Sequence, residues 1–229
     1  AGVPAKSIQV WCDPSSVDLI NEDGTVTPRV DLIELGYEIK STIVDTYRIA
    51  YSLGTSNANE SNVFSAGEEN NEILQLTAHS LDSYSGSYNY DSTQIVFVSD
   101  RAGKKQIYRA NADGTGAIPL TEPSYNAIAP HWCKVTNPID PSFNKIVFAS
   151  DAHTGWQLYT MNSDGTGLTR LTNRTASVYD GDDYSPCWNY DGTRICFVST
   201  RDGVEQIYYI QSNGTGTTNI DATGFSNID

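Results

Sequence analysis

The densest group of carboxylates in the chain lies in the segment YDGDDYSP, where Asp180, Asp182 and Asp183 surround Gly181. Calcium takes about six to eight oxygen ligands from carboxylates and backbone carbonyls, and a glycine lets such a loop turn sharply. The three aspartates are therefore a candidate calcium site. The loop lacks the terminal glutamate of an EF-hand, so a solvated loop between two repeats is the alternative interpretation. The sequence requires no cofactor, and calcium is the one candidate ion.

The chain has three histidines, His79, His131 and His153, and all of them fall in predicted loops. They do not recur at equivalent positions of the internal repeats described below, so the pattern does not predict a shared metal site. The sequence also lacks a Gly-x-Ser-x-Gly motif, which would hold a serine nucleophile on a sharp turn. No catalytic residue is predicted.

Two of the four cysteines can be paired by counting along a hairpin. If Asp191-Gly192 is a two-residue turn, Cys187 lies directly opposite Cys196 on the neighbouring strand. Facing residues at a non-hydrogen-bonded position have the separation that a disulfide needs. The equivalent residues of an earlier repeat are Ser87 and Val96, so the fold does not need cysteines at these positions. We predict a disulfide between Cys187 and Cys196.

The remaining cysteines, Cys12 and Cys133, each follow a tryptophan. A bond between them would tie the N-terminal strand to the third repeat. Free buried thiols are the alternative, because spacing does not establish connectivity.

Three Asn-x-Ser/Thr sequences, at Asn59, Asn173 and Asn213, are candidate N-glycosylation sites. Asn213 also has the position of a turn residue, which is the simpler explanation for it. Glycosylation further depends on the source of the protein.

The elements that must position these residues are internal repeats. The segment IVFVSDRAGKKQIYRANADGTG, residues 95–116, matches ICFVSTRDGVEQIYYIQSNGTG, residues 195–216, at twelve of 22 positions. A third copy spans residues 146–167, and a diverged fourth begins at Arg48. The equivalent isoleucines, Ile49, Ile95, Ile146 and Ile195, are 46, 51 and 49 residues apart, which is close to the length of a four-stranded propeller blade.

Each copy predicts strands separated by tight turns and almost no helix. Short runs of β-branched and aromatic residues are bounded by Gly, Asn and Asp, and no window sustains a period of 3.6 residues. The DGTG and NGTG sequences provide residues that tolerate positive φ where a hairpin must reverse. In these turns the aspartate is expected to hold its own backbone rather than an ion.

The run YSPCWNYDGTRICFVSTRDGVEQIYYIQSNGTG resembles the repeat of TolB-like β-propellers. Blades of that family read Ser-Pro-Asp-Gly, an apolar strand, Ser-x-Arg-x-Gly, an Ile-Tyr strand, an Asp-Gly-x-Gly turn and Leu-Thr. The matching elements here are Asp191-Gly192, Ile195 to Ser199, Arg201, Gly203, Ile207-Tyr208 and Gly214 to Gly216. The resemblance covers residues 85–220 well and 45–80 poorly. It implies the fold and leaves the activity open, because such blades serve as binding platforms, lyases and accessory domains.

The expected architecture is an all-β propeller of about four four-stranded TolB-like blades with an N-terminal extension. The extension, residues 1–30, contains a strand candidate in AKSIQVWC and a hairpin around Asp23-Gly24. The propeller then occupies residues 31–229. Its expected blades span residues 31–80, 81–122, 123–173 and 174–229.

The formal net charge is −14, from 28 acidic and 14 basic residues, so nucleic acid is not an expected partner. No apolar run reaches membrane-spanning length, and membrane insertion is not expected. The chain begins at Ala1 without an apolar leader, which indicates a secreted product that has lost its signal peptide. A chain trimmed for expression is the alternative. The expected location is extracellular or periplasmic.

Two classes of function follow from these features. In the first, the chain is a secreted interaction or structural module that self-associates, into a filament through its N-terminal strand, or binds another extracellular protein. In the second, it is a carbohydrate-binding or polysaccharide-lyase-like propeller, with tryptophan and tyrosine available to stack on glycans. Some TolB-like propellers are lyases that surround an acidic sugar with loop histidines, a metal and basic residues. This chain departs from that pattern in its histidines and its negative charge, so an enzyme is not the expected reading.

Overall fold

The computed structural model describes residues 19–20, 26–27, 48–54, 61–67, 73–78, 82–137, 139–173 and 181–220. The chain divides into two compact units, residues 1–44 and residues 45–229. In the first unit, β1 (Leu19–Ile20) pairs antiparallel with β2 (Val26–Thr27), on either side of the predicted Asp23-Gly24 turn. The strand predicted in AKSIQVWC, together with Cys12, lies outside the described residues.

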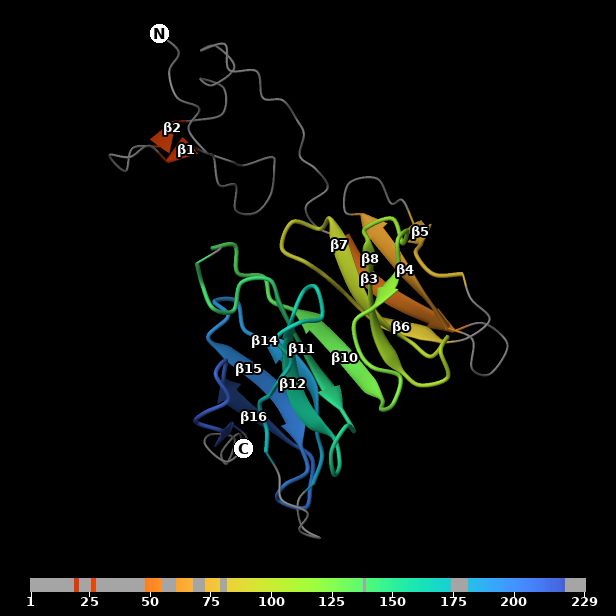
Figure 1. Cartoon of the computed structure of the whole chain (residues 1–229). Helices are drawn as coiled ribbons and strands as arrows, with labels where there is room; N and C mark the ends of the chain where they lie inside the picture. The colour runs from red at the N-terminus through yellow and green to blue at the C-terminus, as the bar shows by residue number, and fades with distance from the viewer. Residues whose placement is uncertain are drawn as a thin grey trace, which may run out of the picture. The chain divides into compact units, whose positions relative to one another are not determined.

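The second unit contains four antiparallel sheets, here called blades 1 to 4 (Figure 1). Blade 1 consists of β3 (Arg48–Gly54), β4 (Ser61–Gly67) and β5 (Ile73–Gln75). Blade 2 consists of β6 (Ser83–Tyr88), β7 (Gln94–Ser99), β8 (Gln106–Asn111) and β9 (Ile118–Pro119). Blade 3 consists of β10 (Ala127–Trp132), β11 (Lys145–Ser150), β12 (Gln157–Asn162) and β13 (Thr169–Arg170). Blade 4 consists of β14 (Asp183–Trp188), β15 (Arg194–Ser199), β16 (Gln206–Gln211) and β17 (Thr218–Asn219).

These sheets confirm the all-β, propeller-type fold. Blades 2, 3 and 4 each have the four expected strands in sequential order, whereas blade 1 has three strands within the described residues. The described part of the chain contains no helix, and so it has no helical segment suited to crossing a membrane. Consecutive strands are neighbours in each sheet, as is usual for strands that are also adjacent in sequence.

The predicted turn chemistry is also confirmed. In the turn after β8, Asp113 Oδ1 accepts hydrogen bonds from the backbone N–H and the hydroxyl of Thr115, at 2.9 and 2.7 Å. Asp164 does the same with Thr166 in blade 3. The hydrogen bonds from threonine lower the pKa of both aspartates. These aspartates therefore hold their own turns, as expected from the DGTG sequences.

The strand register places one aromatic pair in the middle of every blade. The two residues of each pair are cross-strand partners, and their rings stack with centroids 5.7 to 5.9 Å apart. The pairs are Tyr51–Phe64, Phe97–Tyr108, Phe148–Tyr159 and Phe197–Tyr208. Such a pair contributes about 0.5 to 1.5 kcal/mol beyond the area that it buries.

The hydrophobic core lies between consecutive blades rather than inside any one of them. In blades 1 to 3 we call the face that packs against the next blade the forward face, and the opposite face the backward face. The face of blade 4 that carries the equivalent residues keeps the name forward face. Between blades 2 and 3, for example, Val96 and Ile107 of one forward face pack against Trp132 and Phe148 of the next backward face. All four side chains are at most 1% exposed. A single blade cannot bury its own apolar surface, so the stacking of neighbours holds the unit together.

Each innermost strand of blades 2 to 4 contains a β-bulge at the same place. The register with the next strand shifts between Tyr84 and Ser87, between Ile128 and His131, and between Tyr184 and Cys187. The bulged residues Ser85, Ala129 and Ser185 have φ of 55°, 51° and 50°. A bulge of this kind bends the strand and redirects the residues after it.

Candidate functional site

We call the junction between two consecutive blades a seam. At each seam, side chains just before the first strand of the later blade make hydrogen bonds to the earlier blade. Asp182 Oδ1 accepts a hydrogen bond from the backbone N–H of Trp156 in blade 3, at 2.8 Å. The next residue, Asp183, donates its backbone N–H to the Trp156 carbonyl, at 2.9 Å. The two bonds hold the backbone N–H and the carbonyl of one residue, Trp156, in the preceding blade. We call this arrangement the seam latch.

The seam latch recurs between blades 2 and 3, and its side-chain bond recurs between blades 1 and 2. Asn126 Oδ1 accepts from the Lys105 N–H at 3.2 Å, and Ala127 donates to the Lys105 carbonyl at 2.7 Å. Asp82 Oδ1 accepts from the Ser61 N–H at 2.9 Å. An aspartate or asparagine oxygen therefore performs the same task three times, which is to accept a hydrogen bond from a backbone N–H at or just before a strand of the preceding blade.

A second repeated contact crosses the seams beside the bulges. The Ser87 hydroxyl accepts a hydrogen bond from the Trp132 N–H at 3.0 Å. In the next blade, His131 Nδ1 accepts from the Trp188 N–H at 3.2 Å. Cys187 has the equivalent position in blade 4 and is exposed. The histidine is thus a neutral hydrogen-bond acceptor, and its pKa is lowered to about 4 by burial and by the nearby Lys134.

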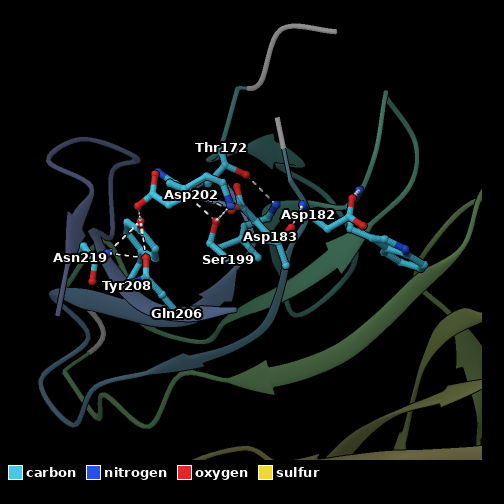
Figure 2. Close-up of polar contacts among 12 residues, drawn as sticks. Thr172, Asp182, Asp183, Ser199, Asp202, Gln206, Tyr208 and Asn219 are labelled. Atoms are coloured by element: carbon cyan, nitrogen blue, oxygen red, sulfur yellow. Dashed lines mark hydrogen bonds and ion pairs between the residues drawn. The ribbon is translucent and has the colours of Figure 1, made fainter. Parts of the chain in front are cut away.

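Blade 4 contains a group of polar contacts around Asp183, which we call the polar cluster (Figure 2). The Asp183 side chain is fully buried and lies 3.0 Å from the Arg201 guanidinium, whose side chain is 24% exposed. Arg201 also donates to the Ser199 hydroxyl at 2.9 Å. Its guanidinium lies over the ring of Tyr208, 4.5 Å from the centroid. The buried carboxylate is thereby paired with a cation that is itself fixed by an aromatic face.

The outer end of the polar cluster is closed by Tyr208, which Figure 2 shows between Asp202 and Asn219. The Tyr208 hydroxyl donates to the Asp202 carboxylate. Asn219 Nδ2 donates to that hydroxyl at 3.0 Å and to Gln206 Oε1 at 2.8 Å. Burial and the hydrogen bond to Asp202 raise the pKa of Tyr208. These bonds join the turn after β15 to β16 and β17, so they stabilise the outer part of the blade.

The candidate calcium ligands are used differently from what the sequence suggests. Asp182 binds the backbone of blade 3, Asp183 pairs with Arg201, and Asp180 lies outside the described residues. The described part of the chain contains no group of three or more His, Cys, Asp or Glu side chains placed to hold a metal ion. Calcium binding stays a prediction.

The histidines also have separate structural contacts where they are described. His131 bonds blade 4 as stated above, and His153 Nδ1 lies 2.6 Å from the Tyr159 hydroxyl within blade 3. His79 lies outside the described residues. The seam role of His131 could have been found in the sequence by aligning the repeats. Each repeat has a polar residue directly before an aromatic one, in the pairs Ser87-Tyr88, His131-Trp132 and Cys187-Trp188.

The facing positions predicted for Cys187 and Cys196 are confirmed, since the two residues are Cα partners across β14 and β15. Both are free thiols in the structure, as is Cys133, so the disulfide itself stays a prediction. Cys133 is fully buried in the core between blades 3 and 4, and burial raises the pKa of its thiol.

The candidate glycosylation sites differ in their contacts. Asn173 is exposed and accepts a hydrogen bond from Arg170. Asn213 is exposed as well, and its Oδ1 accepts from the N–H and hydroxyl of Thr215, as Asp113 does in its own turn. Asn59 lies outside the described residues. Glycosylation at these sites stays a prediction.

Comparison with known proteins gives TolB proteins as relatives. The chain is 39% identical over 66 residues to the Tol-Pal system protein TolB of Geobacter sulfurreducens, a match that covers 29% of this chain and 14% of that protein. It is 27% identical over 144 residues to the TolB homolog of Chlorobaculum tepidum, covering 62% of this chain and 30% of the relative. The chain thus spans less than a third of the length of these two relatives. No protein-family model matches it.

Solved structures agree on the fold. TolB from Acinetobacter baumannii superposes with a TM-score of 0.60 at 20% identity, over 76% of this chain and 41% of that one. An oligogalacturonate lyase in complex with manganese superposes with a TM-score of 0.50 at 14% identity, over 70% of this chain and 42% of that one. At these identities the similarity establishes the propeller fold and does not transfer an activity.

The seam latch predicts different effects for two substitutions of Asp182. The free energy of unfolding of Asp182→Asn should lie within about 0.5 kcal/mol of the wild-type value, because Asn126 makes the same bond with an amide oxygen. Asp182→Ala should lose about 1 to 2 kcal/mol, because the Trp156 N–H is left without its acceptor. Urea unfolding with and without calcium measures both. Equal losses in the two variants, or a stabilisation by calcium that Asp182→Asn abolishes, would contradict the latch and favour a calcium site.

The His131 contact predicts a pH dependence at the seam between blades 3 and 4. The pKa of His131 is about 4 in the folded protein and about 6.5 in the unfolded chain, so the unfolded chain takes up the proton first. The contribution of neutral His131 to the free energy of unfolding should be complete above pH 6.5. It should fall by about 2 to 3 kcal/mol as the pH drops to 4. Other groups titrate in this range, so His131→Ser is the matched control, because Ser87 makes the equivalent bond. The free energy of unfolding of this variant should fall less between pH 7 and pH 4, and identical slopes would refute the assignment.

Proposed function

We propose that this TolB-like β-propeller is a protein-interaction module that acts outside the cytoplasm, in the periplasm or extracellularly, and associates with copies of itself. One observation carries the proposal. Ile207, on the forward face of blade 4, is 48% exposed, whereas its counterparts Ile107 and Leu158 in the interior blades are 0% exposed. An aliphatic side chain that is about half exposed, at a position that is buried in the other blades, is the type of surface feature that binds a protein partner.

The charge of the chain supports a protein partner over a nucleic acid. The net charge of −14 repels phosphate backbones, and an apolar face offers them no compensating cation. Extracellular glycans are a weaker candidate for the same surface, because its residues are mainly aliphatic.

The N-terminal strand is the proposed means of linking copies into a filament. In blades 2, 3 and 4 the innermost strand, β6, β10 or β14, pairs with the strand that follows it. Within the described residues, the sheet of blade 1 begins instead at β3, the counterpart of that second strand. A strand from the arm of a neighbouring copy that paired with β3 would supply main-chain hydrogen bonds and complete the blade. If the addition runs head to tail without closing, it produces a filament.

Export from the cytoplasm makes the remaining modifications chemically reasonable. Disulfides form in oxidising compartments, and Cys187 already faces Cys196. Asn173 is exposed and accessible to glycosylation. Calcium, with Asp180, Asp182 and Asp183 as its candidate ligands, would compete with the seam latch for the Asp182 carboxylate.

An enzymatic role is the less favoured alternative. The oligogalacturonate lyase neighbour shares the fold, but His131 and His153 are each engaged in a hydrogen bond within this chain. We therefore propose a non-enzymatic function, with a carbohydrate-binding or lyase-like propeller as the alternative. Binding of oligogalacturonate by the purified protein would favour that alternative.

Removal of residues 1–10 tests the role of the arm. If the arm pairs with another copy, the truncated protein should keep its thermal stability and become monomeric by light scattering. If the arm completes a blade of its own chain, truncation should lower the melting temperature and leave the particle size unchanged.

A peptide with the sequence of residues 1–10 sharpens this test, and a scrambled peptide is its matched control. Excess peptide should reduce the particle size of the full-length protein by occupying the site of the arm, and the scrambled peptide should not. A full-length protein that stays monomeric at high concentration with calcium present would contradict self-association.

A further inference from the structure

The facing cysteines of blade 4 have no counterpart in blades 2 and 3. Cys187 on β14 and Cys196 on β15 are Cα partners. The same position holds Ser87 and Val96 in blade 2, and a histidine facing a valine in blade 3. Neither of those pairs can form a covalent bond, so the fold of a blade does not require one. The two thiols therefore serve a purpose other than building the blade.

The turn between β14 and β15 decides how this pair is placed in the sheet. The Asn189 N–H donates to the Arg194 carbonyl at 3.0 Å, so these two residues close a four-residue loop. A two-residue hairpin around Asp191-Gly192 would be closed one residue further in. The facing partners are the same in both arrangements, but the ladder hydrogen bonds shift by one residue. Hydrogen-bonded and non-hydrogen-bonded pairs therefore exchange places.

Cys187 and Cys196 lie at a hydrogen-bonded position of the ladder. Trp188, which follows Cys187, donates its N–H away from β15, to His131 of blade 3 at 3.2 Å. The two kinds of pair alternate along an antiparallel ladder. The closing pair of the loop is hydrogen-bonded, the pair of Trp188 is not, and the pair of Cys187 with Cys196 is hydrogen-bonded again. The two-residue turn expected from the sequence predicts a non-hydrogen-bonded position here, and the four-residue loop is the reason for the difference.

This position is unfavourable for a disulfide. Facing Cβ atoms are about 5.5 Å apart in hydrogen-bonded pairs and about 4.5 Å apart in non-hydrogen-bonded pairs, whereas a disulfide holds them at about 3.5 to 4.5 Å. Bond formation must therefore draw the two Cβ atoms together by about 1 Å or more. The backbone resists this movement, because His131 holds the N–H of the adjacent Trp188. The bond would be strained, and a strained disulfide is easier to reduce.

We propose that Cys187 and Cys196 form a reversible redox pair that exchanges with small thiols and disulfides of the glutathione type, and not a permanent structural disulfide. On oxidation, one cysteine thiolate attacks oxidised glutathione, and one glutathione leaves as its thiolate. The second cysteine thiolate attacks the mixed disulfide and releases the other glutathione. Two protein thiols are oxidised, one glutathione disulfide is reduced to two thiols, and the two thiol protons pass to the departing thiolates.

This inference goes beyond the proposed function and stands without self-association. It rests on the register of β14 and β15, and both strands lie within the described residues. Oxidation pulls Cys187 toward β15 and thereby acts on the adjacent Trp188, whose N–H bonds blade 4 to blade 3. The redox state of the pair is thus coupled to the seam between these two blades.

An engineered pair on the same face of blade 4 provides a matched control. Val198 and Ile207 are Cα partners on β15 and β16. The Ile207 carbonyl accepts from the Ile220 N–H at 2.9 Å, so it points away from β15 and the pair is non-hydrogen-bonded. Val198→Cys with Ile207→Cys, in a chain that also carries Cys187→Ser and Cys196→Ser, should form an unstrained disulfide. Because both pairs lie on one face, anything that covers this face affects them alike.

Equilibration with reduced and oxidised glutathione, trapping with N-ethylmaleimide, trypsin digestion and mass spectrometry measure both pairs. Trypsin cleaves after Arg194, between the native cysteines, and after Arg201, between the engineered positions. Each disulfide therefore appears as two linked peptides. The equilibrium constant for oxidation should be at least about tenfold lower for the native pair than for the engineered pair, a difference of about 30 mV in reduction potential.

Three results would overturn the proposal. A native pair that resists reduction as well as the engineered pair does is a structural disulfide. A native pair that stays reduced in excess oxidised glutathione, while the engineered pair oxidises, is not a redox pair. An engineered chain that folds, as judged by circular dichroism, but does not oxidise would show that the register does not decide the outcome.

The wild-type protein gives a second readout that does not depend on the folding of the engineered chain. Its native pair is equilibrated with glutathione in buffer and in urea that unfolds the chain. A structural disulfide oxidises more readily in the folded protein, typically by about thirtyfold or more, because the native structure holds its cysteines together. Strain should reduce this ratio below about ten for Cys187 and Cys196. A larger ratio would contradict the proposal whatever the engineered pair does.

Discussion

The structure depends on the hydrogen bonds by which each blade holds the backbone of one residue in the blade before it. An aspartate or asparagine oxygen accepts the N–H of that residue, and the adjacent N–H donates to the carbonyl of the same residue where the structure describes both bonds. Without these bonds the N–H and the carbonyl would face the next blade unpaired, which is costly for buried polar groups. The latch therefore fixes how consecutive sheets stack, and it makes the spacing of the repeats a consequence of hydrogen-bond geometry as well as of packing.

The apolar contribution comes from the faces that the latch brings together. No blade has enough apolar surface to fold by itself, so stability accumulates from one seam to the next, as in other repeat proteins. Blades 1 and 4 differ in exposure from the two blades between them. A forward face that is buried in blades 2 and 3 is partly exposed in blade 4, and an aromatic pair that is buried in blades 2 to 4 is half-buried in blade 1.

Local chemistry made much of this fold predictable from the sequence. Alternating apolar runs and DGTG turns specify strands and hairpins, and counting from one turn places Cys187 opposite Cys196. The site was harder to predict because its partners are distant in sequence. Asp182 and Asp183 have the composition of a calcium loop, but one binds an amide 26 residues away and the other a guanidinium 18 residues away. His131 similarly acts on Trp188, a contact that only the alignment of repeats could suggest. Sequence periodicity reports which residues are equivalent, and the stacking of blades decides what they touch.

Hydrogen exchange of the backbone amides, measured at low and at high protein concentration, tests most directly whether blades 1 and 4 contact another copy of the chain. When the particle size increases, residues 48–54 and 61–67 of blade 1 and residues 194–211 of blade 4 should gain protection together. The amides of Lys105 and Trp156, which are already held at interior seams, should not change. Protection gained only elsewhere, or no gain at any concentration, would contradict the proposed self-association through blades 1 and 4.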